Sequence, residues 1–245
     1  MKVELFNVGW ITAPAGFWRK GDEDPGRPVR LPVPAYLIET DAQRIVVDTG
    51  LHPAAVAGKS AFYGQSAAME YFELEQTKSI ADQIDVHSVS KIILTHLHFD
   101  HAGGLSLFPD SVPVVVQRAE WEAGKSRADI ERNFFFPRDY ECPKREVVLV
   151  DGDHDLLGDG SVELLFTPGH TQGHQSVRVG NLVLGADVVH FAAGLDDHHF
   201  PAIAHDSALQ AKSADRLRKL RDSGLTVQPG HDPGVLHPGP VELTL

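Results

Sequence analysis

Short runs of β-branched and other apolar residues recur along the chain, separated by segments rich in glycine, proline and charged residues. Runs of about four to eight such residues, bounded by turn residues, are typical of strands. Gly180-Asn181, which separates two of these runs, predicts a tight hairpin turn. The pattern predicts strands at residues 3–10, 35–39, 44–48, 91–95, 112–117, 147–150, 162–166, 176–179, 182–184 and 226–228.

Helix signals lie between the predicted strands. The clearest helix is predicted over residues 206–223, because Asp206 can cap its N-terminus and Gly224 supplies a stop. Residues 79–82, with the sequence SIAD, match a capping box and predict the beginning of another helix. A short helix is predicted over residues 119–125.

Two long segments lack these patterns and are predicted to be loops. Residues 16–34 are rich in glycine, proline and charge, and residues 53–75 mix glycine and serine with aromatic side chains. A further aromatic cluster at residues 134–136 lies near Tyr140 in the sequence. We expect this cluster to belong to the core or to a subunit contact, and the alternative is an apolar wall for a substrate tail.

The order of the elements indicates the class of fold. Predicted strands mostly precede predicted helices, which fits two sheets with helices on their outer faces. The length of 245 residues is enough to bury a substantial core. We therefore predict an α/β protein in which residues 1–245 form a single domain.

Charge and composition narrow the class of partners. The net charge of −12 argues against nucleic acid, because nucleic-acid binding normally requires a basic surface. Cys142 is the only cysteine, so an intramolecular disulfide and a thiolate zinc cage are both excluded. The sequence begins like a strand and contains no stretch that could span a bilayer, which predicts a cytoplasmic protein without a membrane partner.

The most informative chemistry lies at residues 96–101, which read HLHFDH. This segment directly follows the apolar run at residues 91–95. His96 and His98 share a face if the chain is extended, and Asp100 and His101 follow where the strand gives way to a loop. Imidazole and carboxylate groups suit zinc and its first-row neighbours, so two adjacent metal ions could be held there.

Three further apolar runs end in a histidine or an aspartate. Residues 162–166 lead to His170, residues 181–186 lead to Asp187, and a third run ends at His231. Ligands delivered from several strand ends are how a rigid sheet positions a metal site. The repetition favours a metal centre over a solvated cluster of incidental histidines.

These segments together resemble the metallo-β-lactamase superfamily. The resemblance is spread over nearly the whole chain. Within the superfamily the chain is most similar to the N-acyl homoserine lactonases, because of Phe99, Gly103-Gly104 and the short segment GHTQGHQS. The motifs that carry the resemblance are VDTG at 47–50, HLHFDHAGG at 96–104, TPGHTQGHQS at 167–176, LGAD at 184–187 and PGH at 229–231.

The resemblance implies a four-layer αββα sandwich, two divalent metal ions and a homodimer. Zinc is the expected metal, although iron, manganese and cobalt accept the same ligands. Asp48 would orient a ligand histidine by a hydrogen bond. The ligands implied by position are His96, His98 and His170 for one ion, Asp100, His101 and His231 for the other, and Asp187 as the bridge.

The implied activity is opening of the lactone ring of N-acyl homoserine lactones, which is quorum quenching, by attack of a hydroxide that bridges the two ions. Asp100 and His190 are the candidate catalytic residues. The lactonases commonly have a tyrosine three residues after the bridging aspartate, and this chain has His190 there. A histidine could support the oxyanion or protonate the leaving alkoxide, and the alternative is an ordinary polar residue beside the site.

Other functions compete with this interpretation. A hydrolase of other esters, thioesters, β-lactams or phosphotriesters could use the same scaffold. A redox di-iron relative is disfavoured, since it would have a carboxylate where His98 stands and a fused flavin domain. A non-catalytic module that binds metal or a signal molecule is the alternative of another class. We expect His174 to be a packed structural histidine, and we expect His198, His199, His205 and His237 to lie on the surface or in loops.

Overall fold

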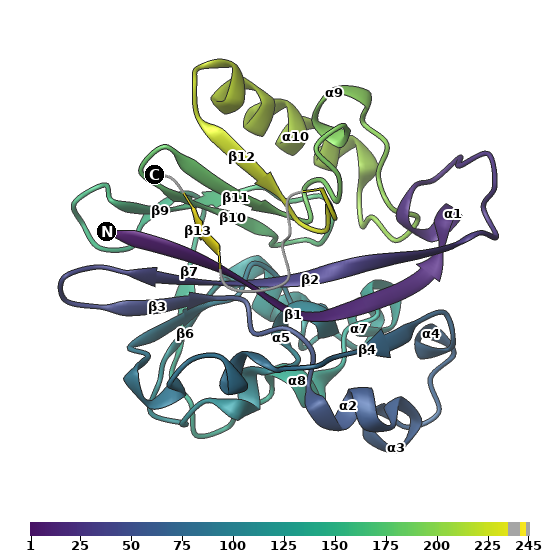
Figure 1. Cartoon of the computed structure of the whole chain (residues 1–245), viewed down its shortest axis with the longest axis horizontal. Coiled ribbons are helices and arrows are strands. Elements are labelled where there is room, and N and C mark those ends of the chain that lie inside the picture. The colour runs from purple at the N-terminus through teal and green to yellow at the C-terminus, as the bar shows by residue number, and fades with distance from the viewer. Residues whose placement is uncertain (235–240, 244–245) are drawn as a thin grey trace.

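The computed structural model describes residues 1–234 and 241–243. In this part of the chain, two sheets lie face to face and helices cover both outer faces (Figure 1). The predicted α/β class and its four-layer αββα order are confirmed. Within the same residues, no helix is both long and apolar enough to cross a membrane.

The larger sheet consists, along the described chain, of β1 (Lys2–Pro14), β2 (Pro28–Glu39), β3 (Arg44–Val47), β4 (Glu73–Glu75), β5 (Lys91–Ile93), β6 (Val114–Gln117), β7 (Val147–Val150) and β13 (Val241–Leu243). Its order is β13-β1-β2-β3-β5-β6-β7, and β4 pairs with the far part of β1. Strands β3, β5, β6 and β7 run parallel, so their carboxyl ends share one edge.

The smaller sheet has the order β12-β11-β10-β9-β8. The turn predicted at Gly180-Asn181 is present, because Val179 pairs with Leu182 across a hairpin. Gly180 has a φ of +58°, which glycine adopts without strain. The strands are β8 (His154–Asp155), β9 (Val162–Phe166), β10 (Gln175–Val179), β11 (Leu182–Ala186) and β12 (Thr226–Pro229).

The helices are mostly short. The predicted long helix is present as α10, and the Asp206 carboxylate accepts hydrogen bonds from the N–H groups of Ala208 and Leu209, each at 2.9 Å. The α-helices are α1 (Ala15–Trp18), α2 (Pro53–Ala57), α3 (Lys59–Tyr63), α4 (Ala67–Glu70), α5 (Phe99–Ala102), α6 (Arg118–Ala123), α7 (Arg127–Asn133), α8 (Pro137–Tyr140), α9 (Gly194–Asp197) and α10 (Ser207–Asp222). The 3-10 turns are η1 (Ile80–Asp82), η2 (Val86–Ser88) and η3 (Leu105–Leu107).

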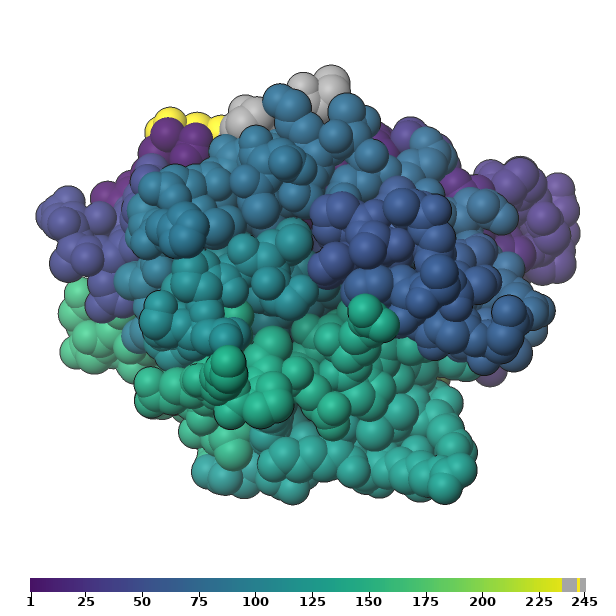
Figure 2. Space-filling view, turned by 90° about the horizontal axis from the view of Figure 1, so that it is seen from below, coloured from purple at the N-terminus to yellow at the C-terminus, as the bar shows by residue number. Residues whose placement is uncertain are grey.

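Successive side chains along each strand pack on opposite faces of the sheet. Leu164 of β9 points into the apolar cluster between the sheets, where it meets Ile38 and Val47 of the larger sheet. Its neighbour Leu165 points outward and packs in the cluster that contains Leu217 of α10. This period of two is what a strand buried on both faces requires. Beneath the larger sheet, the segments from α2 to α8 form the outer face seen in Figure 2.

Several sequence predictions are wrong in detail. The predicted loop 16–34 includes the first half of β2, because pairing with β1 organises it. Its prolines are tolerated since β2 pairs with β3 only over Tyr36–Glu39, which leaves the other edge of the proline-rich part without a strand partner in the described residues. The predicted loop 53–75 contains α2, α3, α4 and β4, which are too short to show a periodic pattern.

The capping box at Ser79 is present but begins only the turn η1 instead of a full helix. The Ser79 N–H donates to the Asp82 carboxylate at 2.8 Å. A second capped turn begins at Asp85, whose carboxylate accepts from the His87 N–H at 3.0 Å, and this ends the first. Two capped turns in close succession leave no room for a helix.

The aromatic cluster belongs mainly to the core, as expected. Phe135 and Tyr140 are buried beneath the larger sheet. Phe134 differs, because it adopts the left-handed conformation after α7 and lines a surface groove.

Candidate metal centre

The strand ends of both sheets bring the predicted ligands together. His96 follows β5 and His170 follows β9, while Asp187 directly follows β11 and His231 lies just after β12. Ala186, immediately before Asp187, has a φ of +45°, which is strained for a residue with a side chain. The chain turns at this left-handed residue, and the Asp187 carboxylate that follows lies among the other ligands.

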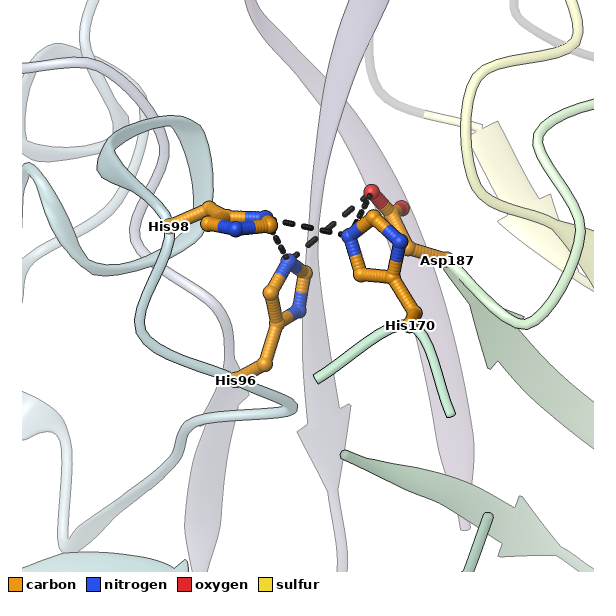
Figure 3. Close-up of side chains that lie close together, drawn as sticks. All are labelled: His96, His98, His170 and Asp187. Carbon is orange, nitrogen blue, oxygen red and sulfur yellow. Dashed lines mark hydrogen bonds and ion pairs between the residues drawn. The ribbon is translucent and has the colours of Figure 1, made fainter. Parts of the chain in front are cut away.

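His96, His98 and His170 form the three-histidine group (Figure 3). His98 Nδ1 lies 2.9 Å from His96 Nε2 and 3.0 Å from His170 Nε2. All three side chains are at most 5% exposed. Three buried nitrogens that converge on one point are a ligand set suited to a first-row metal ion.

Asp100, His101 and His231 form the second group, which we call the carboxylate group. Asp100 Oδ2 lies 3.6 Å from His101 Nε2 and 3.5 Å from His231 Nε2. The group comes from α5 and from the loop after β12, so the two halves of the chain both contribute to it.

Asp187 lies between the two groups. Its Oδ2 is 3.3 Å from His170 Nε2 and 3.8 Å from His96 Nε2. Its Oδ1 is 3.4 Å from His101 Nε2 and 3.2 Å from His231 Nε2. One carboxylate oxygen therefore faces each group, which is the arrangement a bridging ligand requires.

The outward nitrogens of three histidines are held by acceptors. His98 Nε2 donates to the carbonyl oxygen of Asn133, and His231 Nδ1 donates to that of Pro32, both at 2.8 Å. His101 Nδ1 donates to Asp48 Oδ2 at 2.7 Å, so the contact predicted for Asp48 is present. Because the acceptors bind the outward N–H groups, they select the tautomer in which the inward nitrogens can serve as metal ligands.

Buried polar atoms in the centre fit metal ions. His101 Nε2 and His231 Nε2 lie 3.4 and 3.2 Å from Asp187 Oδ1, but none of these three atoms makes a well-aligned hydrogen bond among the described residues. An unpaired buried polar atom is costly, and it is rare in native proteins without an ion or a water molecule. The donor set of imidazoles and carboxylates suits zinc, iron, manganese and cobalt.

The electrostatics of the two groups differ. Burial lowers the pKa of His96 and His170 well below the usual value, and it lowers the pKa of His98 to about 4. Burial also opposes protonation of His101 and His231, but the carboxylates of Asp187 and Asp100 outweigh it and raise the pKa of both.

His190 lies inside the centre and is 5% exposed. Its Nε2 is 3.2 Å from Asp187 Oδ2, and its ring stacks on His231 with centroids 5.0 Å apart. Asp187, His190 and His231 form a third group that could hold a metal ion, which the sequence did not predict. The Trp18 ring packs next to His190, with the two ring centroids 5.7 Å apart, and covers this side of the centre.

His174 has the structural role expected from the sequence. Its Nε2 accepts a hydrogen bond from the Asp187 N–H at 3.1 Å, and its Nδ1 lies 3.0 Å from Thr167 Oγ1. Of the histidines expected outside the site, His198 pairs with Asp215 at 3.2 Å. His237 lies outside the described residues.

Gly230 shows why the PGH motif contains glycine. A Cβ atom at this position would lie 2.5 Å from Asp187 Oδ1 and 2.8 Å from the Ala186 carbonyl oxygen. A side chain would therefore displace the carboxylate that lies between the two groups.

An apolar groove adjoins the centre. A cleft of about 20 Å³ beside Asp187 and His190 is closed by Phe17, Phe72 and Ile203. The same three side chains line a groove of about 330 Å³. Its other lining residues are Pro14, Gly16, Ala68, Tyr71, Phe134 and Ala202.

Comparisons with known proteins agree with the fold and the site. Residues 28–231 match the family described as the metallo-beta-lactamase superfamily. The chain therefore belongs to the metallo-β-lactamase superfamily. The fold family and the structures of its lactonases imply a dinuclear centre of divalent metal ions.

The similarity to N-acyl homoserine lactonases within that superfamily is confirmed. An N-acyl homoserine lactonase of Bacillus cereus is 32% identical over 209 residues, which cover 80% of this chain and 79% of the relative. The lactonase AttM of Agrobacterium fabrum is 28% identical over 87% of each chain. A solved N-acyl homoserine lactone hydrolase, with N-hexanoyl-L-homoserine bound at its catalytic metal centre, has a TM-score of 0.82 at 26% identity. The match covers 95% of this chain and 94% of that chain.

Glu120, a buried residue next to the loops of the three-histidine group, was not predicted from the sequence. Glu120 is 0% exposed, and burial raises its pKa to about 7, although hydrogen bonds to its carboxylate oppose this shift. Its neighbours in the sequence carry no motif, so the only available signal was an acidic residue within a predicted short helix.

Proposed function

We propose that this protein is a dinuclear metal-dependent lactonase that opens the lactone ring of N-acyl homoserine lactones. The observation that carries the proposal is the position of Asp187, with one oxygen toward each of two ligand groups. The similarity to lactonases over most of the chain supports the substrate class.

The proposed ligands are those of the two groups, with Asp187 shared between them. Zinc is the metal we propose, since it accepts histidine and carboxylate ligands at low coordination number. When bound, two divalent cations lower the pKa of water and polarise a carbonyl oxygen, which is the chemistry that ester hydrolysis at neutral pH needs.

The residues of the chain have separate proposed roles. Asp187 and Asp100 offset half of the positive charge of two divalent ions, so the centre keeps a net positive charge that can attract a carbonyl oxygen. His190 faces the same cleft, and its side chain can donate a hydrogen bond to the carbonyl oxygen or give a proton to the leaving alkoxide. Trp18 and Phe72 exclude bulk water from this side of the cleft.

The apolar groove supports an acylated substrate. Phe17, Phe72 and Ile203 line both the cleft and the groove, so these side chains lie between the two and must shift for a ligand at the metals to extend into the groove. An acyl chain gains about 0.8 kcal/mol for each methylene group it buries there. The acyl chain of the substrate therefore has a place to bind that a small unacylated lactone would not use.

We also propose a homodimer, as the family resemblance implies. The segment between β1 and β2 projects from one end of the molecule (Figure 1) and contains many exposed residues, so it is a candidate contact. Sedimentation or light scattering of the purified protein measures the mass directly, and a monomer at micromolar concentration would contradict this proposal.

The test of function is hydrolysis of N-butanoyl- and N-decanoyl-L-homoserine lactone by the zinc-loaded protein, measured as proton release. We expect turnover that a chelator abolishes and that zinc restores. Rates on a thioester, a β-lactam and a phosphotriester, measured in parallel, identify any other hydrolase activity. If the wild type and an Asp100→Ala variant that still folds show the same residual rate, no higher than that of buffer alone, the protein is a binding module and not a lactonase.

A further inference from the structure

The carboxylate of Glu120 contacts both loops that carry the three-histidine group. Glu120 lies in α6, and its side chain is fully buried. Its Oε1 accepts a hydrogen bond from the N–H of Leu97 at 3.0 Å, and its Oε2 accepts one from the N–H of Gly173 at 2.8 Å. Leu97 separates the first two histidines of the group, and Gly173 lies in the loop of the third.

We propose that Glu120 is a positioning residue of the three-histidine group, which sets the spacing of its two loops and thereby the affinity of that group for a divalent metal ion. The proposal rests on the function proposed above, because it assumes that both groups hold metal ions.

A carboxylate is suited to this position because it offers two acceptor oxygens to two donors. Buried backbone N–H groups need partners, and above its pKa of about 7 the charged Glu120 carboxylate accepts stronger hydrogen bonds than a neutral group would. An amide offers a single oxygen, so its NH₂ group would face one of the two N–H donors. Glutamine at residue 120 therefore cannot satisfy Leu97 and Gly173 together.

The loop of His170 also packs directly against the backbone of α6. A Cβ atom at Gly173 would collide with the backbone nitrogen and Cα of Glu120. The glycine thus permits the close approach that brings its N–H to the carboxylate. Side-chain chemistry and backbone packing point to the same contact.

Other contacts keep the two loops together at their base. The N–H of Gln175 donates to the carbonyl oxygen of Thr95 at 2.9 Å, and Gln175 Nε2 donates to that of Leu94 at 2.8 Å. These bonds lie next to the strands and not beside the ligands. Loss of the Glu120 carboxylate is therefore expected to change the ligand spacing without separating the two sheets.

Asp48 has the equivalent position at the carboxylate group. It accepts hydrogen bonds from the Thr95 N–H at 2.8 Å and from His101 Nδ1 at 2.7 Å. Asp48 contacts a proposed ligand directly, whereas Glu120 acts through the backbone of the loops. Asp48 also accepts a hydrogen bond from Thr95 Oγ1, which lies 3.0 Å from His96 Nδ1, so Glu120 is the carboxylate that acts on the three-histidine group without a direct contact to the other group.

The experiment is a zinc titration of the full chain, first stripped with a chelator and then titrated against a chromophoric chelator. We expect two zinc ions for the wild type. Glu120→Gln should weaken one of the two binding steps by about 10–100-fold and leave the other unchanged. Glu122→Gln is the matched control, because Glu122 is an exposed acid on the same helix and should bind zinc like the wild type.

Two ligand variants assign the weakened step. In a His98→Ala background, where the three-histidine group already lacks a ligand, Glu120→Gln should add less than about a twofold change. In a His231→Ala background it should keep its full effect. Thermal unfolding of the zinc-free proteins verifies that each variant folds.

The proposal is overturned if Glu120→Gln binds zinc like the wild type, weakens both steps equally, or has the same effect in both backgrounds. Glu120→Asp, which keeps the charge but cannot span both loops, is judged by the same criteria if Glu120→Gln does not fold. Two tightly bound zinc ions without lactone turnover would refute the lactonase and leave this proposal standing. Fewer than two zinc ions in the wild type would overturn both.

Discussion

The three-histidine group and the carboxylate group both contain histidine side chains. The structure lowers the pKa of the histidines in the first group and raises the pKa of those in the second. Burial lowers the pKa of His96 and His170 well below the usual value. His101 and His231 are equally buried, but nearby carboxylates more than offset the burial and raise the pKa of both. The balance between carboxylates and neighbouring histidines, and not the depth of burial, decides the direction of each shift.

This difference in histidine pKa predicts how pH affects metal binding at each group. A ligand histidine must be deprotonated, so protons compete with the metal more strongly at the carboxylate group. The same carboxylates attract a cation more strongly once the pH is high enough. The three-histidine group has less negative charge around it and relies more on the spacing of its ligands.

The largest effect is expected for Asp187→Asn, which removes the charge that both groups share. Loss of this charge should lower turnover by about 10³-fold or more, because it weakens several kcal/mol of electrostatic stabilisation. Metal analysis should find fewer than two ions. Asp222→Asn changes an exposed acid and is the control. Two bound ions with wild-type turnover would show that Asp187 does not bridge the groups.

Asp48→Asn should affect the carboxylate group most, because Asp48 contacts His101 directly and reaches His96 only through Thr95. The amide removes a charge that raises the pKa of His101 and weakens the bond that orients its ring. We expect about 10–100-fold weaker binding of one zinc ion, as measured by competition with a chelator. An unchanged His101 pKa in the metal-free protein, followed by NMR, would contradict the electrostatic part of this explanation.

His190→Phe tests a side chain that lies next to both groups. If His190 acts as a donor toward substrate, turnover should fall by about 10²-fold while both metal ions remain. His190→Tyr should retain more activity, because it restores a donor. Loss of one metal ion in His190→Phe would instead assign His190 as a ligand in the third group.

Ala68→Trp fills part of the groove without touching either group. The variant should raise KM for N-decanoyl-L-homoserine lactone by about 10-fold, because two or so buried methylene groups lose their contacts. KM for the N-butanoyl substrate should change little. Equal changes for both substrates would show that the acyl chain does not occupy the groove.

Asp139 is a buried carboxylate outside the metal centre, and it tests how burial shifts the pKa of a carboxyl group there. Neighbouring histidines lower the pKa of Asp187 even though burial opposes this, whereas burial raises the pKa of Asp139 to about 8. The raised value means that the folded state holds the proton more tightly than the unfolded state. Asp139 therefore stabilises the fold at low pH, and this contribution is lost as the pH rises through about 8.

Asp139→Asn should remove that dependence with little effect on turnover. Urea unfolding from pH 5 to 9 should show the wild type losing more stability toward high pH than the variant, which keeps only the dependence due to other groups such as Glu120. Parallel curves for the two proteins would contradict the assigned pKa.

Much of the fold follows from local patterns. Apolar runs with a period of two mark the strands because each strand must bury a face. The helix cap at Asp206 and the turn at Gly180 can be recognised from neighbouring residues alone. The short helices of residues 53–75 were missed because they stop before a period becomes visible. The first half of β2 was missed because its partner strand, and not its own sequence, organises it.

By itself, the sequence determined the four segments that deliver histidine and aspartate from strand ends, and with them the superfamily and the candidate ligands. How these residues share charge depends instead on the folded arrangement of the chain. The opposite pKa shifts, the position of His190, the groove and the contacts of Glu120 all depend on residues far apart in the chain. Local spacing carries the identity of ligands, whereas electrostatics and loop geometry depend on the three-dimensional distances between segments that only folding brings together.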